Sequence, residues 1–277
     1  MQVNRARDYA WLCPIVSLLL AAATLLAFGL TWWNALILAV LFGCVIAAAW
    51  ALVFGLLTAE TAEPVPETQG LTIEWMAAFY DPMCRLFGLG RAFREEMLRV
   101  CALQLGERVL DAGCGTGVWT RLAAKVVGPT GRCIGIDPGP RMIGIARRDA
   151  SKENSSAEFK LAAVEQLPFG DDSFDVVMLC LVLHHLPPEV KRKGLQEIHR
   201  VLRPGGRLIV VDFDHPDSLH WRMVMRPLLP ARTAADLVPG KVLAYLQGVG
   251  FDPVATDGRW RRLLTFWIAV KPVSPRR

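Results

Sequence analysis

The stretch Val109-Leu110-Asp111-Ala112-Gly113-Cys114-Gly115-Thr116-Gly117 decides the fold of this 277-residue chain. An apolar strand enters a loop with glycine at every second position, and a helix is predicted over Val118–Val127. Glycine lets a backbone turn tightly and come close to a ligand, while the following helix start offers free N–H groups. A lone Gly-x-Gly is weak evidence, so the interpretation depends on what surrounds it.

Strands and helices alternate on both sides of this loop. The other predicted strands are Arg132–Asp137, Ala157–Ala162, Phe174–Cys180 and Arg207–Phe213, after a first strand over Arg108–Ala112, and the further helices are Pro140–Ala150, Pro188–Leu202 and Gly240–Val249. Such alternation implies an α/β fold with a doubly wound, mostly parallel sheet. Two last strands, Phe251–Thr256 and Leu263–Val270, are joined by a turn around Asp257-Gly258 and bring the predicted sheet to seven strands.

Asp137 ends the second predicted strand, 20 residues after Gly117. An acid there can accept hydrogen bonds from both ribose hydroxyls of a nucleoside; its alternative role is to cap the helix that begins at Pro140. Asp111 precedes the first glycine, where it would repel a diphosphate but attract a sulfonium or ammonium group. The electrostatics therefore favour S-adenosylmethionine over NAD or ATP.

Several motifs then follow in order, and with them the stretch from about Tyr80 to Val270 resembles the class I S-adenosylmethionine-dependent methyltransferases. It is most similar to the branch of ubiquinone/menaquinone C-methyltransferases and bacterial phospholipid N-methyltransferases. This resemblance implies a Rossmann-like methyltransferase fold, methyltransferase activity and S-adenosyl-L-methionine as cofactor, but not a particular substrate. It is carried by Val109–Gly117, Ile136-Asp137, Glu165–Phe169 with Asp172–Asp175, Leu183–Leu186, Leu202–Gly206 and Tyr80-Asp81.

The same resemblance implies the residues that bind the cofactor. The glycines of the loop let the backbone approach its amino-acid end, Asp137 holds the ribose, and Met142 packs on adenine or in the core. The family often has an acid that contacts the adenine amino group at the position of Ala163. Backbone groups of Ala163 and Val164 are the candidates to hold the ring instead, and we expect either a somewhat weaker affinity for the cofactor or an adenine contact made elsewhere. The full predicted set is Tyr80, Asp111, Gly113, Gly115, Gly117, Asp137, Met142, Ala163, Val164 and Cys180.

His184 and His185 follow the fourth core strand, where the methyl acceptor should lie. One of them is a candidate catalytic base; the alternative is that they line the pocket. His215, with Asp212 and Asp214, is similar to a metal cluster, but these are read as strand-end or loop residues and no metal site is predicted. The seven cysteines form no Cys-x-x-Cys pair, which favours a reducing compartment.

No Asp, Glu, Lys or Arg occurs among the 51 residues from Tyr9 to Ala59. A membrane span needs about 20 apolar residues, so two spans are predicted, over Tyr9–Leu30 and Asn34–Leu57. A cleaved signal peptide and a buried soluble core are the alternatives. The expected domains are a transmembrane hairpin (1–58), a linker (59–70) and a methyltransferase domain (71–277).

Arg5 and Arg7 precede the first predicted span, so the N-terminus and the methyltransferase domain are expected in the cytoplasm, on an integral membrane protein. Anchoring predicts the bilayer as partner and a lipophilic acceptor, either a quinone-like ring or a phospholipid amine, beneath a lid at His215–Leu229. A methyltransferase for a small soluble metabolite, or a cofactor-binding membrane protein without catalysis, are the alternatives. The net charge of +5 comes without a basic tract with interleaved aromatics, so nucleic acid is not an expected partner.

Overall fold

A computed structural model describes residues 64–213, 240–252, 254–261 and 263–273. Both predicted membrane spans, most of the linker's first half and the predicted lid at 215–229 lie outside the described residues. Among the residues that are described, no helix is both long enough and apolar enough to cross a membrane.

Seven strands form one sheet in the order β3-β2-β1-β4-β5-β7-β6. The first five strands in this order are parallel to one another, and β7 runs antiparallel to both β5 and β6. This confirms the predicted mostly parallel, doubly wound sheet. The strands are β1 (Arg108–Ala112), β2 (Arg132–Asp137), β3 (Glu158–Leu161), β4 (Phe174–Cys180), β5 (Leu202–Phe213), β6 (Val254–Trp260) and β7 (Leu264–Val270).

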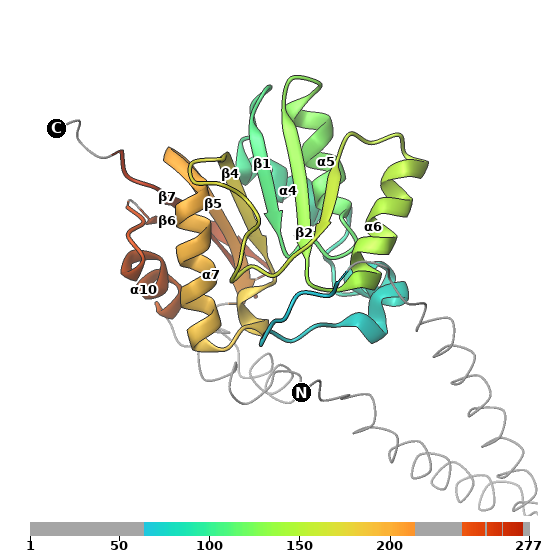
Figure 1. Cartoon of the computed structure of the whole chain (residues 1–277), viewed down its shortest axis with the longest axis horizontal. Helices are drawn as coiled ribbons and strands as arrows, with labels where there is room; N and C mark the ends of the chain where they lie inside the picture. The colour runs from blue at the N-terminus through green and yellow to red at the C-terminus, as the bar shows by residue number, and fades with distance from the viewer. Residues whose placement is uncertain (1–63, 214–239, 253, 262, 274–277) are drawn as a thin grey trace, which may run out of the picture. The chain divides into compact units, whose positions relative to one another are not determined.

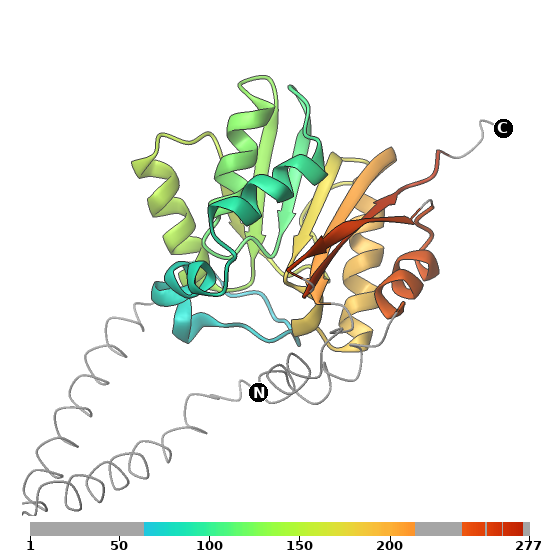
Figure 2. The same ribbon diagram turned by 180° about the vertical axis from the view of Figure 1, so that it is seen from behind.

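Successive strand residues point to opposite faces of the sheet, and both faces are covered by helices. Leu110 belongs to a buried cluster with residues of α7 (Pro188–Val201) and α10 (Lys241–Gly248) on one face, while Val109 belongs to a second cluster with residues of α4 (Arg91–Cys101) and α5 (Val118–Val127) on the other. Figure 1 shows α7 over the near face, and α4 lies over the opposite face in Figure 2. The helices are η2 (Glu74–Phe79), α3 (Tyr80–Leu86), α4 (Arg91–Cys101), α5 (Val118–Val127), α6 (Pro140–Lys152), η3 (Leu183–His185), α7 (Pro188–Val201) and α10 (Lys241–Gly248).

Two sequence predictions about strand ends are wrong. The turn placed at Asp257-Gly258 lies inside β6, where the pairing with β7 shifts register between Thr256 and Arg259. Gly258 has φ +85°, which a bulge uses as readily as a hairpin turn. Leu202 was predicted to end a helix, and 203–206 to connect it to a strand that begins at Arg207. Instead β5 begins at Leu202, because Leu202 already pairs with Phe174 of β4.

The N-terminal part of the described chain, residues 64–86, runs along the carboxyl edge of the parallel strands (Figure 1). We call residues 64–79 the strap. It is attached at three places: the Leu71 N–H donates to the His185 carbonyl at 3.0 Å, the Thr68 hydroxyl donates to Glu165 at 2.6 Å, and Glu74 accepts from the Arg141 N–H at 3.1 Å. The strap thereby forms one wall of the space at that edge.

Candidate active site

A cavity lies between the strap and the carboxyl ends of β1 to β4. It encloses about 700 Å³ of empty space, its open mouth included. Seven of the ten predicted cofactor-binding residues line it, as does one of the two predicted histidines. The lining residues are Thr68, Gly70, Leu71, Thr72, Ile73, Tyr80, Gly113, Gly115, Asp137, Pro138, Met142, Ala162, Val164, Glu165, Cys180, Leu181, Val182, His185 and Leu186.

The glycine-rich loop brings bare backbone to this cavity. Gly113 has φ +82°, and a Cβ built on it would lie 2.3 Å from Val182, which leaves no room for a side chain. The N–H groups of Gly113 and Cys114 donate to the Ile136 carbonyl, both at 2.8 Å, so the loop is fixed onto β2. Gly113 and Gly115 are therefore where sequence analysis expected them.

Gly117 has a different task from the one predicted. It precedes α5 with φ +70°, and a Cβ there would lie 2.3 Å from the ring of Phe159 on β3. It is not among the cavity-lining residues. Because Gly117 has no side chain, α5 and Phe159 of β3 can pack closely. A glycine-rich sequence alone does not distinguish this packing role from contact with a ligand.

Asp137 lies at the carboxyl end of β2, and both of its carboxylate oxygens accept hydrogen bonds from backbone N–H groups. Its Oδ2 accepts the Gly115 N–H at 3.0 Å and its Oδ1 accepts the Gly139 N–H at 2.8 Å. Burial raises the pKa of Asp137 to about 6, against the lowering effect of these two bonds. Each carboxylate oxygen has a second lone pair, so the group can still accept from ribose hydroxyls. Capping of α6 is provided instead by Glu74, through the Arg141 N–H.

Asp111 lies beneath the loop and not on the cavity wall. It is 3% exposed and accepts a hydrogen bond from the Thr120 hydroxyl of α5 at 2.5 Å. Burial raises its pKa to about 7, and the nearby Asp137 carboxylate adds to that rise. Asp111 is therefore not placed for direct contact with a ligand in the cavity, and its charge acts from behind the loop.

Tyr80 and Cys180 line the cavity beside β1 and β4. Tyr80 opens α3, which is attached to the glycine-rich loop because the Thr116 hydroxyl donates to Asp81 at 3.0 Å. Cys180 ends β4, and burial raises the pKa of its thiol well above the usual value. A neutral thiol is a poor nucleophile, so Cys180 is suited to stand beside an electrophilic group without reacting.

The two histidines have different positions. His185 lines the cavity, and its buried Nδ1 has no hydrogen-bond partner within the described chain. His184 is not a lining residue: its Nδ1 lies 2.8 Å from Oδ1 of buried Asp212, and its ring contacts that of His185 at a tilt of 44°, with centroids 3.8 Å apart. Burial and the neighbouring imidazole lower the pKa of His185 to about 3, so it is neutral at physiological pH.

Of the three residues that resemble a metal cluster in the sequence, Asp212, Asp214 and His215, the first pairs with His184. The other two lie outside the described residues. Within the described ranges, no cluster of three or more His, Cys, Asp or Glu side chains is placed to hold a metal ion.

Ala163 and Val164 follow β3, and only Val164 reaches the cavity. Glu165, which is not among the predicted site residues, lines the cavity beside Val164 and accepts a hydrogen bond from Thr68 on the strap. Glu165 lies in Glu165–Phe169, one of the motifs that carry the family resemblance. Its contact with Thr68 joins residues 97 apart, so no local sequence pattern indicates it.

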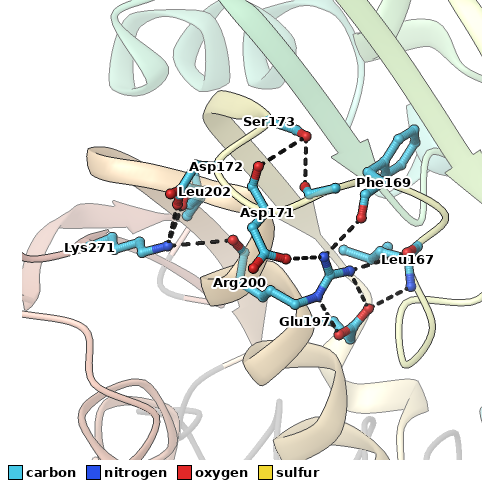
Figure 3. Close-up of polar contacts among 10 residues, drawn as sticks. Leu167, Phe169, Asp171, Asp172, Ser173, Glu197, Arg200, Leu202 and Lys271 are labelled. Carbon is cyan, nitrogen blue, oxygen red and sulfur yellow. Dashed lines mark hydrogen bonds and ion pairs between the residues drawn. The ribbon is translucent and has the colours of Figure 1, made fainter.

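The loop that carries Glu165 is fixed from below by α7 (Figure 3). Glu197 accepts the Leu167 N–H at 2.9 Å, and Arg200 donates to the carbonyls of Phe169 and Leu167 as well as to Asp171. Three hydrogen bonds to backbone and the ion pair between Arg200 and Asp171 therefore hold the β3–β4 connection, so this segment is positioned by α7 rather than by loop sequence alone.

The charge of the lining fits a cation. Asp137 and Glu165 are its ionisable acids, and it contains no Lys or Arg among the described residues. A diphosphate would meet no compensating positive charge here, whereas a sulfonium or ammonium group would be attracted. The cavity therefore suits S-adenosylmethionine, as the Asp-x-Gly-x-Gly pattern predicts.

Known proteins that resemble this chain are methyltransferases. Residues 109–206 match a family described as a methyltransferase domain. The demethylmenaquinone methyltransferase of Listeria monocytogenes serotype 4a is 32% identical over 154 residues, which is 54% of this chain and 64% of that protein. The ubiquinone/menaquinone biosynthesis C-methyltransferase UbiE of Ectopseudomonas mendocina is 34% identical over 165 residues, 56% of this chain and 64% of that protein. The chain thus spans somewhat less than two thirds of these relatives.

Solved structures show the same fold. A SAM-dependent methyltransferase from Aquifex aeolicus has a TM-score of 0.52 at 21% identity, covering 64% of this chain and 89% of that one. Phosphoethanolamine N-methyltransferase 2 of Haemonchus contortus, solved with S-adenosylhomocysteine, has a TM-score of 0.54 at 17% identity, covering 66% and 53%. In its fold and its cavity the described part of this chain is similar to the SAM-dependent methyltransferases, and its residues 109–206 match a methyltransferase domain.

Proposed function

We propose that this protein transfers a methyl group from S-adenosylmethionine to a lipophilic, membrane-associated acceptor, and that the acceptor is a quinone-like ring. The observation that carries the proposal is the wall after β4, where the neutral imidazole of His185 stands among Leu71, Val182 and Leu186. Two relatives, a demethylmenaquinone methyltransferase and a ubiquinone/menaquinone biosynthesis C-methyltransferase, support the same acceptor class.

When bound, S-adenosylmethionine supplies an electrophilic methyl group next to a sulfonium. Asp137 would hold the ribose, the backbone at Gly113 and Gly115 would pass beneath the amino-acid end, and buried Asp111 would favour its ammonium charge. The strap and Tyr80 close the site from the other side and exclude water. Because the methyl group is already activated, positioning of the acceptor is the main task left to the protein.

His185 is suited to orient the acceptor. Its Nδ1 is buried and has no hydrogen-bond partner within the described chain, so a hydroxyl of the methyl acceptor can donate a hydrogen bond to it. A pKa of about 3 makes His185 a weak base, far from the pKa of a phenol, so complete removal of the proton by this group is unfavourable. Polarising a ring hydroxyl through this bond raises the electron density of the ring carbon that attacks the methyl group.

A phospholipid amine is the second acceptor that the sequence leaves open. An ammonium headgroup requires acidic or carbonyl partners near the transferred methyl group. The acids of the lining, Asp137 and Glu165, belong to the ends of β2 and β3, whereas His185 follows β4. This distribution favours a neutral ring over a cationic amine.

The proposal includes attachment to the membrane. The uncharged 51-residue run from Tyr9 to Ala59 supports two spans, and Arg5 and Arg7 before it support a cytoplasmic methyltransferase domain. The bilayer would then be a partner that delivers the acceptor, with no role for nucleic acid. The short linker would keep the cavity close to the membrane surface.

The acceptor is identified by labelling. Membranes containing the full chain are incubated with S-adenosylmethionine that carries a radiolabelled methyl group, and the lipids are extracted and separated. We expect the label in the quinone fraction, and none with an Asp137→Ala variant. Label in the amine phospholipids supports the second acceptor, and label in neither fraction, with a labelled water-soluble product, contradicts a lipophilic acceptor.

A further inference from the structure

The outer side of α3 is apolar although it faces solvent. Phe79, Leu86 and Phe87 are 66%, 84% and 56% exposed. Phe79 is the N-cap residue of α3 and Phe87 its C-cap residue, and residues three, four or seven apart on a helix lie on one side. Exposed Pro82 and half-buried Met83 belong to the same side. We call these five residues the α3 face.

The inner side of the same helix is already occupied. Tyr80 lines the cavity, and Cys84 is buried. Within the described chain, none of the three exposed side chains of the α3 face belongs to a buried apolar cluster. Single exposed apolar residues are ordinary on a protein surface, whereas a contiguous group of them usually marks a binding surface. The α3 face is therefore a candidate docking surface.

Two arginines flank the α3 face. Arg85 lies in the last turn of α3, and Arg261 packs over Gly88, where a Cβ would meet its guanidinium group. Both arginines are exposed, and among the residues that the structure describes neither has an acidic partner. By contrast, Arg91 is paired with Glu95 at 2.7 Å. An apolar surface with unpaired cations at its border is complementary to an anionic bilayer, which is apolar below its negative headgroups.

The chain before α3 favours a bilayer as the occupant of this face. The uncharged run ends at Ala59, 20 residues before Phe79, and a segment of that length reaches at most about 70 Å when fully extended. If the run spans the membrane, as proposed above, the bilayer is present at a high effective concentration and no free partner has to be recruited. A soluble protein partner has no such advantage.

We infer that the α3 face docks onto an anionic phospholipid bilayer, with Phe79, Leu86 and Phe87 at the level of the acyl chains and Arg85 and Arg261 against the headgroups. The inference rests on the membrane attachment of the proposed function and adds the docking surface and the charge of the lipid. A helix with its side chains is about 10 Å thick, and the inner side of α3 lines the cavity, so docking would bring the cavity wall close to the bilayer. A lipophilic acceptor would then have a short path from the lipid to the cavity.

Photocrosslinking tests this contact on the full chain. The variant Leu86→p-benzoylphenylalanine is reconstituted into liposomes and irradiated, and its adducts are identified by mass spectrometry. Benzophenone inserts into C–H bonds, so a docked α3 face gives a phospholipid adduct. Leu105→p-benzoylphenylalanine is the matched control, because Leu105 is 78% exposed but precedes β1, at the amino edge of the sheet. We expect at least about tenfold more lipid adduct at position 86 than at position 105.

Further variants test the apolar and the charged parts of the surface separately, with the probe kept at position 86. Phe79→Ser combined with Phe87→Ser removes two apolar anchors and should lower the lipid adduct at least about fivefold. Addition of phosphatidylglycerol to phosphatidylcholine liposomes should raise the adduct at least about threefold, and Arg85→Gln combined with Arg261→Gln should abolish this increase. Arg108→Gln is the control that keeps the increase, since this exposed arginine starts β1 at the amino edge.

The outcomes separate the inference from the function beneath it. Equal lipid adducts at positions 86 and 105, an adduct that the two serine substitutions leave unchanged, or an adduct with a second copy of the chain in place of lipid overturns the inference. An adduct that does not respond to phosphatidylglycerol overturns the choice of an anionic lipid. Where the contact fails but membrane quinone is still methylated in the same preparation, the proposed function stands without this surface. Conversely, a strong lipid adduct at position 86 in membranes where the methyl label enters only a water-soluble product supports the docking surface and contradicts the lipophilic acceptor.

Discussion

Cofactor affinity should depend on pH through Asp137, whose carboxylate faces the cavity at the end of β2. Burial raises its pKa to about 6 in the ligand-free protein. Ribose hydroxyls are donors, so the ligand binds the ionised carboxylate and is disfavoured by the protonated one. Affinity for S-adenosylhomocysteine is therefore low at acidic pH and rises as pH passes through about 6.

The magnitude follows from the ionised fraction. With a pKa of about 6, roughly 9% of Asp137 is ionised at pH 5 and about 99% at pH 8, which raises affinity about tenfold. Asp111, with a pKa of about 7, goes from roughly 1% to about 90% ionised over the same range and steepens the rise where its charge acts on the ammonium group. The combined increase lies between tenfold and about a thousandfold.

The assay is calorimetry from pH 5 to pH 8 in pairs of buffers that differ in ionisation enthalpy. Near pH 6 the heat should depend on the buffer, because binding releases protons. Asp137→Asn removes about one power of ten from the pH dependence, and Glu158→Gln leaves the profile unchanged. An affinity that is constant within twofold, or an Asp137→Asn profile with the parent slope, would refute the reasoning.

Three further variants test the site and its support. His185→Phe should lower kcat at least about tenfold and leave S-adenosylhomocysteine affinity within twofold, measured by steady-state kinetics and calorimetry. Asp212→Asn should cost about 2 kcal/mol in urea unfolding, because buried His184 loses its charged partner. Gly117→Ala should cost about 1–3 kcal/mol, since its Cβ would meet Phe159 at φ +70°. Gly144→Ala, with open space around it in α6, should not destabilise the protein.

Strands and helices with a strong local pattern are predictable from the sequence. The bounds of β1, β2, β4 and α5 agree with the predicted ranges. Each is a short apolar run or an amphipathic segment with a turn residue such as Gly, Pro or Ser on at least one side, so its pattern is visible among neighbouring residues. The error at Gly258 arose because a glycine with positive φ serves a bulge as well as a turn, and only the pairing with β7 decides between them.

The residues of the candidate site likewise fall into those whose position the sequence predicts and those whose position it does not. Gly113, Gly115 and Asp137 follow strand ends, and the carboxyl ends of parallel strands meet at one edge, so their convergence follows from the sequence once the fold class is known. The positions of Asp111 and Gly117 do not follow, because whether a loop residue faces a ligand or a packed helix depends on Thr120 and Phe159, which approach from other elements.

The sequence by itself therefore determined the mostly parallel sheet, the cofactor class and the edge at which the cofactor binds. The tertiary structure decided which of two adjacent histidines reaches the cavity and which is bonded to Asp212 behind it. It also decided that Thr68 meets Glu165 across 97 residues of chain. The physical reason is range: hydrophobic periodicity and glycine geometry act between near neighbours, whereas the direction of a polar side chain is set by partners that only folding brings together.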